Sequence, residues 1–516
     1  MTSALFEILV DRAKAVPLAQ QIRLHLERLI QSRALAPGVK LPATRELART
    51  LGVNRATVGL AYEELVSGGW AWAHVGQGTF VGPREGPVPR ETETAAPDAQ
   101  GAVDWRGLLS KSAQVIAADV QRQHTVPLPD RLSAGVISFA GGMPDSDLFP
   151  TEDFRRVLNH VIRQEGPALL QYYPVGGYPP LRRFLSGYLL RFGLEVRPEE
   201  LLIVNGSQQG FDLIARTLID PGDFVAIEQP TYPRAVQVFR SFGALLLPVP
   251  IGSDGPRVDA LERTLERHTP KFLFCQPSAH NPTGLTMSAE ARRRLLDVAV
   301  RRQVVIVEDG FDPGLCYGPP PPSPLKALDH DGLVIYIGTF SKILFPGLRL
   351  GWVIAPAPVL ERLEVAKQLA DIQTSALIQA AVFHFCERRL LERHVERIGT
   401  EYERRQRRLL ESLARRMPRG VTWTETQGGF SSLVTLPDAM SATALLRRAI
   451  ARGVAFTPGP AFYIDQGGEH RLRLSFSSVP VSRIDEGVRR LADVIREARR
   501  RSAPQHDAER AAVPLV

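Results

Sequence analysis

Residues 338–351 read GTFSKILFPGLRLG, the most informative motif of the chain. An apolar run at 334–337 comes directly before it and predicts a buried strand. Lys342 lies at the centre of the stretch, and its neighbours in sequence include two hydroxyl side chains and one guanidinium, those of Thr339, Ser341 and Arg349. This set suits a phosphorylated aldehyde, because the amine can form an imine while the hydroxyls and the guanidinium hold the phosphate. The stretch therefore predicts a covalent cofactor site after a strand.

Other short apolar runs precede this stretch and alternate with helical stretches; they lie at residues 201–204, 224–227, 272–275 and 304–307. This alternation predicts an α/β domain with a mostly parallel sheet. In such a sheet the loops at the carboxyl ends of the strands gather at one edge and build the site. The side chains of these loops are therefore the candidates for the rest of the cofactor site.

The loop after 201–204 reads NGSQQG and opens a helix, whose first N–H groups can bind a phosphate. The donors would be Gly206, Ser207 and Gln208. After the second run, Tyr232 can stack on a flat aromatic ring. After the third, Asn281 is held extended by Pro282, and its amide can bond a phenolic oxygen.

The fourth run ends at Glu308 and Asp309. A carboxylate there can pair with a pyridinium nitrogen and keep the ring an electron sink. Asp309 is the expected partner, because the side chain of Glu308 should point to the opposite face of the sheet.

The order of these motifs, GSQQ, PTY, NPTG, ED, TFSK and GLRLG, resembles that of the class I, fold-type I aminotransferases, which use pyridoxal 5'-phosphate (PLP). Two further segments, ISFAGGMPDSDLFP and YYPVGGYPPLR, are similar to the aminoadipate and kynurenine aminotransferase branch. The resemblance implies an aldimine between PLP and Lys342, a second catalytic role for Asp309, and a smaller C-terminal α+β subdomain. It also implies that Gly142 lines the substrate side, that Tyr172 reaches the cofactor phosphate of a partner subunit, and that Arg473 clamps a substrate carboxylate.

One feature departs from that family. Its members usually carry a tyrosine two or three residues after the aspartate, where the hydroxyl bonds the cofactor's phenolic oxygen. Phe311 and Asp312 occupy these positions here. We therefore expect a ring contact without the hydroxyl, and slow or incomplete transamination.

The first 82 residues have a different pattern. Apolar residues at helical spacing from Leu18 predict a first helix. A short second helix is expected to be capped by Thr44, and a third opens at Asn54 or Arg55. Residues 70–82 predict a two-stranded wing. The order resembles the winged helix-turn-helix of GntR-family regulators. It implies that Arg45 contacts the phosphate backbone, that Arg55 and Thr57 read base edges, and that Gly76 lies near the minor groove. Many relatives carry a longer polar residue at the position of Gly59.

The sequence thus predicts four segments: a winged helix-turn-helix at 1–82, a flexible linker at 83–103, a PLP-binding domain at 104–500 and a disordered tail at 501–516. No apolar run is long enough for a membrane span, and the start has no signal-peptide pattern. The three cysteines have no CxxC spacing, so we expect no metal site and a reducing cytoplasm. The net charge of +8 is a mild sign of an anionic partner.

The two domains together resemble the MocR family of bacterial regulators. That resemblance implies a head-to-tail homodimer that binds a double-stranded DNA operator and uses PLP, an amino compound or both as effectors. Two functions remain open on the sequence. One is a transcription factor whose PLP site is a sensor; the other is a working aminotransferase, from amino acid to 2-oxo acid, that also carries a DNA-binding domain.

Overall fold

The structure is a computed structural model, and it describes residues 17–31, 35, 38–67, 70–74, 78–81, 108–110, 113, 116–117, 135–437, 440–465 and 467–502. The chain divides into two compact units, Met1–Leu108 and Leu109–Val516, which we call the head and the body and describe separately. The predicted linker and Gly76 lie outside the described residues, as does the predicted tail except for its first two residues, which continue the last helix to Ser502.

The described residues of the head form three helices and a hairpin: α1 (Leu18–Gln31), α2 (Thr44–Leu51), α3 (Arg55–Ser67), β1 (Ala71–His74) and β2 (Gly78–Val81). The two strands pair antiparallel, which confirms the predicted wing. The side chains of Ile22, Leu26, Val58 and Leu65 are fully buried at the centre of this unit. An amphipathic three-helix core of this kind folds around its own apolar cluster.

The helix starts in the head differ in one detail from the prediction. Thr44 does not cap α2: it is the first helical residue, and Ala43 precedes it without a side-chain cap. In α3 the capping residue is Asn54, whose side-chain oxygen accepts from the Ala56 N–H at 3.0 Å. Gly52 ends α2 in the left-handed conformation with φ 62°, which makes the tight turn between the two helices.

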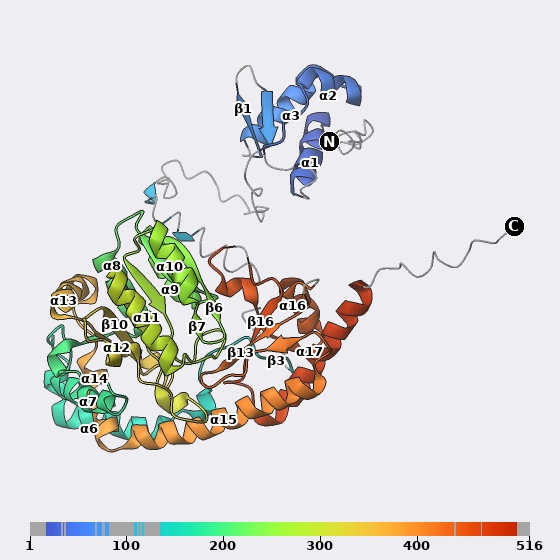
Figure 1. The fold of residues 1–516 in the computed structure, drawn as a ribbon. Helices are drawn as coiled ribbons and strands as arrows, with labels where there is room; N and C mark the ends of the chain where they lie inside the picture. Colours follow the sequence, from blue (N-terminus) through green and yellow to red (C-terminus); the bar gives the residue numbers. More distant parts are fainter. Residues whose placement is uncertain are drawn as a thin grey trace. The chain divides into compact units, whose positions relative to one another are not determined.

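The body is built on an eight-stranded sheet in the order β4-β11-β10-β9-β8-β5-β6-β7 (Figure 1). The strands are β4 (Leu201–Val204), β5 (Phe224–Gln229), β6 (Leu245–Gly252), β7 (Gly255–Pro256), β8 (Phe272–Cys275), β9 (Val305–Asp309), β10 (Val334–Thr339) and β11 (Gly351–Ile354). Only β11 and β7 run antiparallel to their neighbours. Every predicted strand is present, and three of them continue two residues further toward the site.

Helices cover both faces of this sheet. They include α8 (Ser207–Leu218), α9 (Pro233–Ser241), α10 (Val258–Arg267), α11 (Ala289–Arg302), α12 (Leu325–Leu328) and α13 (Ala357–Asp371). Adjacent residues of β5 show the two faces, because Ala226 and Ile227 belong to different buried clusters. A helical layer of α6 (Thr151–Leu169), α7 (Pro179–Leu190) and α14 (Ala376–Glu387) packs together beside the sheet (Figure 1).

The long helix α15 (Leu390–Arg416) leads from this layer to a smaller C-terminal subdomain (Figure 1). Its antiparallel sheet has the order β12-β13-β16-β15, formed by Thr422–Trp423, Ser431–Thr435, Arg471–Ser475 and Thr457–Pro458. Helices α16 (Ala442–Ala451) and α17 (Val481–Ser502) pack on each other, and β3 (Ile137–Ser138) pairs with β14 (Val454–Ala455). The predicted fold class is confirmed. Within the described residues, no helix is both long and apolar enough to cross a membrane.

Candidate functional site

A cavity lies where β5, β8, β9 and β10 end, and residues of the C-terminal subdomain close its far side. The structure brings most of the predicted site residues together there: Gly142, Ser207, Tyr232, Asn281, Asp309, Thr339, Lys342 and Arg473 all line this cavity. Since these residues come from loops far apart in the sequence, the parallel sheet is what assembles them.

Lys342 is enclosed by the walls of the cavity. Its Nζ donates a hydrogen bond to the Gly142 carbonyl at 3.0 Å and lies 5.8 Å from the centre of the Phe430 ring. Burial lowers the pKa of this amine to about 8, with a further lowering by the Arg473 charge, while Asp309 acts in the opposite direction. A lowered pKa increases the fraction of neutral, nucleophilic amine near neutral pH, and covalent capture of an aldehyde requires that form.

This environment predicts a pH dependence. The rate at which PLP forms a borohydride-reducible adduct with the apoprotein should rise with pH through about 8, as the neutral amine appears. Arg473→Met should move the midpoint upward, because removing a nearby cation raises the pKa of Lys342. Both proteins can be followed by mass spectrometry after reduction. A wild-type midpoint near 10.5, the value of an ordinary lysine, would contradict this account.

Asp309 stands at the end of β9 and lines the cavity. Its Oδ2 accepts from the Gln276 amide at 2.6 Å, and burial raises the pKa of its carboxyl to about 7. Glu308 points to the other face, as expected, where its carboxylate accepts from the N–H groups of Leu325 and Lys326 at 3.0 and 2.9 Å. Asp309 is thus the carboxylate available to a ring nitrogen.

The residues around the start of α8 are suited to a phosphate, although only Ser207 and Thr339 of this set line the cavity itself. Gly206 precedes α8 with φ 76°, and a Cβ at this glycine would lie 2.9 Å from the Arg349 guanidinium. Arg349 also donates to the Asn205 carbonyl at 3.1 Å, and the Thr339 hydroxyl donates to Ser341 at 2.8 Å. A bare helix start, a guanidinium and two hydroxyls therefore converge, which is the donor set of an anion site.

Not every predicted phosphate donor contributes a side chain. Gln208 is exposed and does not line the cavity, so only its backbone N–H at the start of α8 is suited to the role. The phosphate contacts of Gly206, Ser207 and Gln208 remain predictions.

Arg473 lies on β16, with its guanidinium above the Phe462 ring at 4.9 Å. It donates to the Asn281 side-chain oxygen at 3.1 Å, and also to the carbonyls of Ala140 and Gly141 and to the Thr457 hydroxyl. No carboxylate of the described residues forms an ion pair with it, and its Nε is buried without a hydrogen-bond partner among them. A largely desolvated cation without a counter-ion favours an anionic ligand.

The same contact fixes Asn281. Its side-chain oxygen is engaged by Arg473, so the amide nitrogen is left to donate toward the cavity. This matches the predicted role of donating to a phenolic oxygen.

The loop after Asp309 lacks the family's tyrosine hydroxyl, and the structure shows what replaces it. Phe311 lines the cavity and packs edge-on against Phe430, with ring centres 6.2 Å apart. Asp312 turns away to accept from the Tyr188 hydroxyl at 2.6 Å and from the Gly314 N–H at 2.8 Å. Phe311 therefore supplies a ring surface and no proton donor.

Tyr172 does not line the cavity; its side chain is 80% exposed just after α6. Its predicted role needs a second copy of the chain and remains a prediction. The sequence reading missed Gln276 and Phe430, which both line the cavity. The position of Gln276, directly after the 272–275 strand, was the signal that would have identified it.

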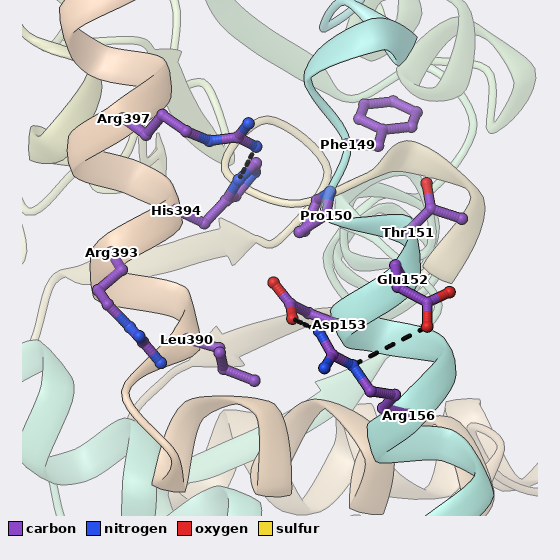
Figure 2. Close-up of a pocket in the computed structure, with 10 residues that line it drawn as sticks. All are labelled: Phe149, Pro150, Thr151, Glu152, Asp153, Arg156, Leu390, Arg393, His394 and Arg397. Atoms are coloured by element: carbon purple, nitrogen blue, oxygen red, sulfur yellow. Dashed lines mark hydrogen bonds and ion pairs between the residues drawn. The ribbon is translucent and has the colours of Figure 1, made fainter.

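A second hollow lies between the starts of α6 and α15, where Figure 2 shows several charged side chains facing one another. Arg156 pairs there with Glu152 and Asp153, and Arg397 donates to His394 at 3.2 Å. Arg156 has carboxylate partners, and Arg393 and Arg397 are exposed to solvent, so none of these cations requires an anionic ligand and we assign no function to this hollow.

In the head, the predicted DNA-contacting residues lie on α2 and α3. Arg45 and Arg55 are both exposed, and neither forms an ion pair with another described residue. Thr57 is half-buried in the first turns of α3. No atom of the described residues lies within 4 Å of the point where a Cβ would stand at Gly59, so their packing does not require a glycine there.

The fold and the cavity define a PLP-binding, fold-type I aminotransferase domain that is joined to a winged helix-turn-helix. Residues 134–491 match the family described as Aminotransferase class I and II, and residues 18–81 match the Bacterial regulatory proteins, gntR family. The chain belongs to the aminotransferase class I and II family and, with its gntR-type head, to the MocR-type regulators within it.

Similar proteins fall into two groups, those that match nearly the whole chain and those that match the body alone. The first group includes the uncharacterized HTH-type transcriptional regulator YdfD of Bacillus subtilis, which is 30% identical over 94% of this chain and 98% of its own. It also includes the probable rhizopine catabolism regulatory protein MocR of Rhizobium meliloti, which is 30% identical over 94% of this chain and 95% of its own. The second group includes the solved structure of LysN, the α-aminoadipate aminotransferase of Thermus thermophilus, complexed with N-(5'-phosphopyridoxyl)-L-leucine. LysN is 38% identical to this chain, with a TM-score of 0.69, and the match covers 77% of this chain and 99% of LysN. The protein is therefore a PLP-dependent, DNA-binding transcriptional regulator.

Proposed function

We propose that the body is a sensor. Lys342 would hold PLP through its amine, and an amino compound whose carboxylate binds Arg473 would exchange its own amine for that of Lys342 on the cofactor. The observation that carries this proposal is the Arg473 guanidinium in the cavity wall, which has protein acceptors around it but no carboxylate partner among the described residues. A ligand carboxylate supplies the missing charge with bidentate geometry.

The remaining residues have separate roles in this proposal. Asp309 binds the ring nitrogen and Asn281 the phenolic oxygen, while Tyr232 packs on the ring. The phosphate is held by the start of α8 and by Arg349, Thr339 and Ser341. Lys342 would hold the cofactor covalently, and its amine would be free to act as a base once a ligand amine had replaced it. When bound, PLP supplies the electron sink that amino-acid chemistry requires.

The alternative is a working aminotransferase with a DNA-binding head. It is supported by the complete set of Lys342, Asp309, Arg349 and Arg473, and by the likeness of the body to the LysN aminotransferase, at 38% identity. Phe311 favours the sensor, because the cavity lacks the proton donor that the enzymes place there. Turnover with amino acids and 2-oxoglutarate, measured beside operator binding, separates the two.

We further propose that the regulator is a homodimer. Apolar side chains are unusually exposed at the ends of α6 and α13, where Leu170, Tyr172, Leu369 and Ile372 are 71%, 80%, 84% and 50% exposed. The two ends adjoin, since the Gln373 side chain bonds the Tyr173 N–H. Covering these side chains with a second copy would bury them and bring Tyr172 to the partner's site.

The DNA contacts can be tested by two substitutions on the head. Arg55→Ala should cost about 1–3 kcal/mol at the cognate operator and relax its sequence preference, as expected when an arginine that reads a base is removed. Arg45→Ala should weaken binding to all sequences about equally and flatten the salt dependence, as expected for a phosphate contact. Anisotropy titrations at several salt concentrations provide the comparison. Equal, sequence-independent losses for both variants would reject the base-reading role of Arg55.

A further inference from the structure

Gln276 occupies a central place beside the cofactor site. It is the first residue after β8, and its side-chain amide donates to the Asp309 carboxylate at 2.6 Å. The oxygen of the same amide accepts from the Asn281 backbone N–H at 3.3 Å. One side chain thus connects Asp309, proposed for the ring nitrogen of PLP, with Asn281, proposed for the phenolic oxygen.

The backbone of Gln276 is also fixed, by a hydrogen bond to a buried carboxylate. Its N–H donates at 2.8 Å to the carboxylate of Glu228, a residue fully buried on β5. Glu228 lies 3.5 Å from the His280 ring, and His280 in turn bonds the Thr283 hydroxyl at 2.8 Å. These contacts leave Gln276 little freedom to turn away from Asp309.

We propose that Gln276 is a positioning residue that keeps Asp309 ionised and directs its second oxygen to the ring nitrogen of PLP. Gln276 does so because its N–H donates to one carboxylate oxygen, and donation stabilises the charged form of the acid. The other oxygen, Oδ1, accepts from no side-chain donor among the described residues and is left to the cofactor. This inference rests on the proposed PLP site and adds a residue to it.

The need for such a donor follows from the surroundings of Asp309. Burial raises the pKa of the carboxyl to about 7, and the Gln276 hydrogen bond and the Lys342 charge act against that rise. The other titratable groups that interact with it are mostly acidic or neutral: Glu228, Tyr232, Cys275, Glu308 and Tyr336. Without the amide, more of Asp309 would be protonated at neutral pH, and a protonated acid binds a pyridinium nitrogen poorly.

The experiment is a measurement of PLP affinity against pH in Gln276→Met, which keeps the side-chain volume and removes the donor. A hydrogen bond to a charged group is worth about one to two pKa units. The Kd for PLP at pH 7.5, measured by equilibrium dialysis, should therefore rise by about 3- to 25-fold. The defect should shrink at higher pH, where Asp309 ionises in both proteins.

Two controls separate positioning from general damage. Gln379→Met also removes a buried glutamine that makes two hydrogen bonds, to the Tyr178 N–H and the Thr374 carbonyl, but away from the cavity; it should leave the pH dependence of PLP binding unchanged. In an Asp309→Asn background, Gln276→Met should have little further effect, because the acid on which it acts is gone.

The outcomes are distinguishable from failure of the site itself. If wild-type protein binds no PLP, the proposed function fails. If wild-type protein binds PLP and Gln276→Met binds it equally well at pH 7.5, only the role of Gln276 is overturned. A loss that is the same at every pH, or that persists undiminished beside Asp309→Asn, also overturns it, since either result indicates structural disruption.

Discussion

Lys342→Ala protein will carry no covalently attached PLP after borohydride reduction, whereas wild-type protein will gain the mass of the reduced cofactor on one peptide. Covalent capture needs a neutral amine, and the Lys342 amine is both enclosed in the cavity and lowered in pKa to about 8. Removing it leaves the phosphate donors and Asp309 in place. We therefore expect weak, non-covalent PLP binding to survive and the reducible link to be lost completely.

Lys326→Ala is the matched control for this experiment. Its amine is also mostly shielded from solvent, but it pairs with Asp329 at 3.0 Å and does not belong to the cavity lining. This variant should retain the full adduct. If wild-type protein at saturating PLP shows no reducible adduct, or if the label maps to another lysine, the assignment of Lys342 is wrong.

A carboxylate-bearing amino acid, added after PLP, will change the affinity of the regulator for its operator by about 5- to 150-fold, the usual size of an allosteric coupling of about 1–3 kcal/mol. A ligand changes DNA binding only if it binds two states of the protein with different affinity. Arg473 is positioned to provide that difference, because its present partners are backbone carbonyls, one hydroxyl and one amide, which a ligand carboxylate can replace.

Arg473→Met should abolish the response to amino acids while preserving the PLP adduct and the basal affinity for DNA. Amines without a carboxylate should act weakly on wild-type protein for the same reason. The measurement is an anisotropy titration of labelled operator with PLP alone and then with a panel of amino acids and amines, with absorption spectra in parallel. If an amino acid reacts fully with the bound cofactor, turns over at enzyme-like rates and leaves operator affinity unchanged, the aminotransferase alternative replaces the sensor.

Much of the fold and the site could be predicted from sequence because both are encoded locally. Each predicted strand was a short apolar run, and a parallel sheet necessarily places the residues that follow such runs at one edge. Lys342, Asp309 and Asn281 therefore line the same cavity although they were identified on separate loops. The contrast between Asp309 and Glu308 followed from the alternation of side chains along a strand.

The contacts that were missed depend on tertiary structure. Gln276 looked like an ordinary loop residue, since its role depends on a hydrogen bond to Asp309, 33 positions away. The absence of an ion pair between Arg473 and any described carboxylate is likewise visible only when its surroundings are assembled. Thr44 was misjudged because a threonine at the first helical position and one at the cap have the same local sequence signature, and only the backbone separates them.

The empty space at Gly59 bears on how operators for this regulator can evolve. If α3 reads the operator as proposed, Gly59 would present no side chain to the edge of a base pair, and direct readout would be absent at that point of the helix. Mutations at the operator base pair that faces Gly59 would then have little effect on regulation, and the base at this position could differ from one promoter to another. The positions facing Arg55 and Thr57 would stay under purifying selection, so related binding sites would share a discontinuous signature with a tolerant gap inside it.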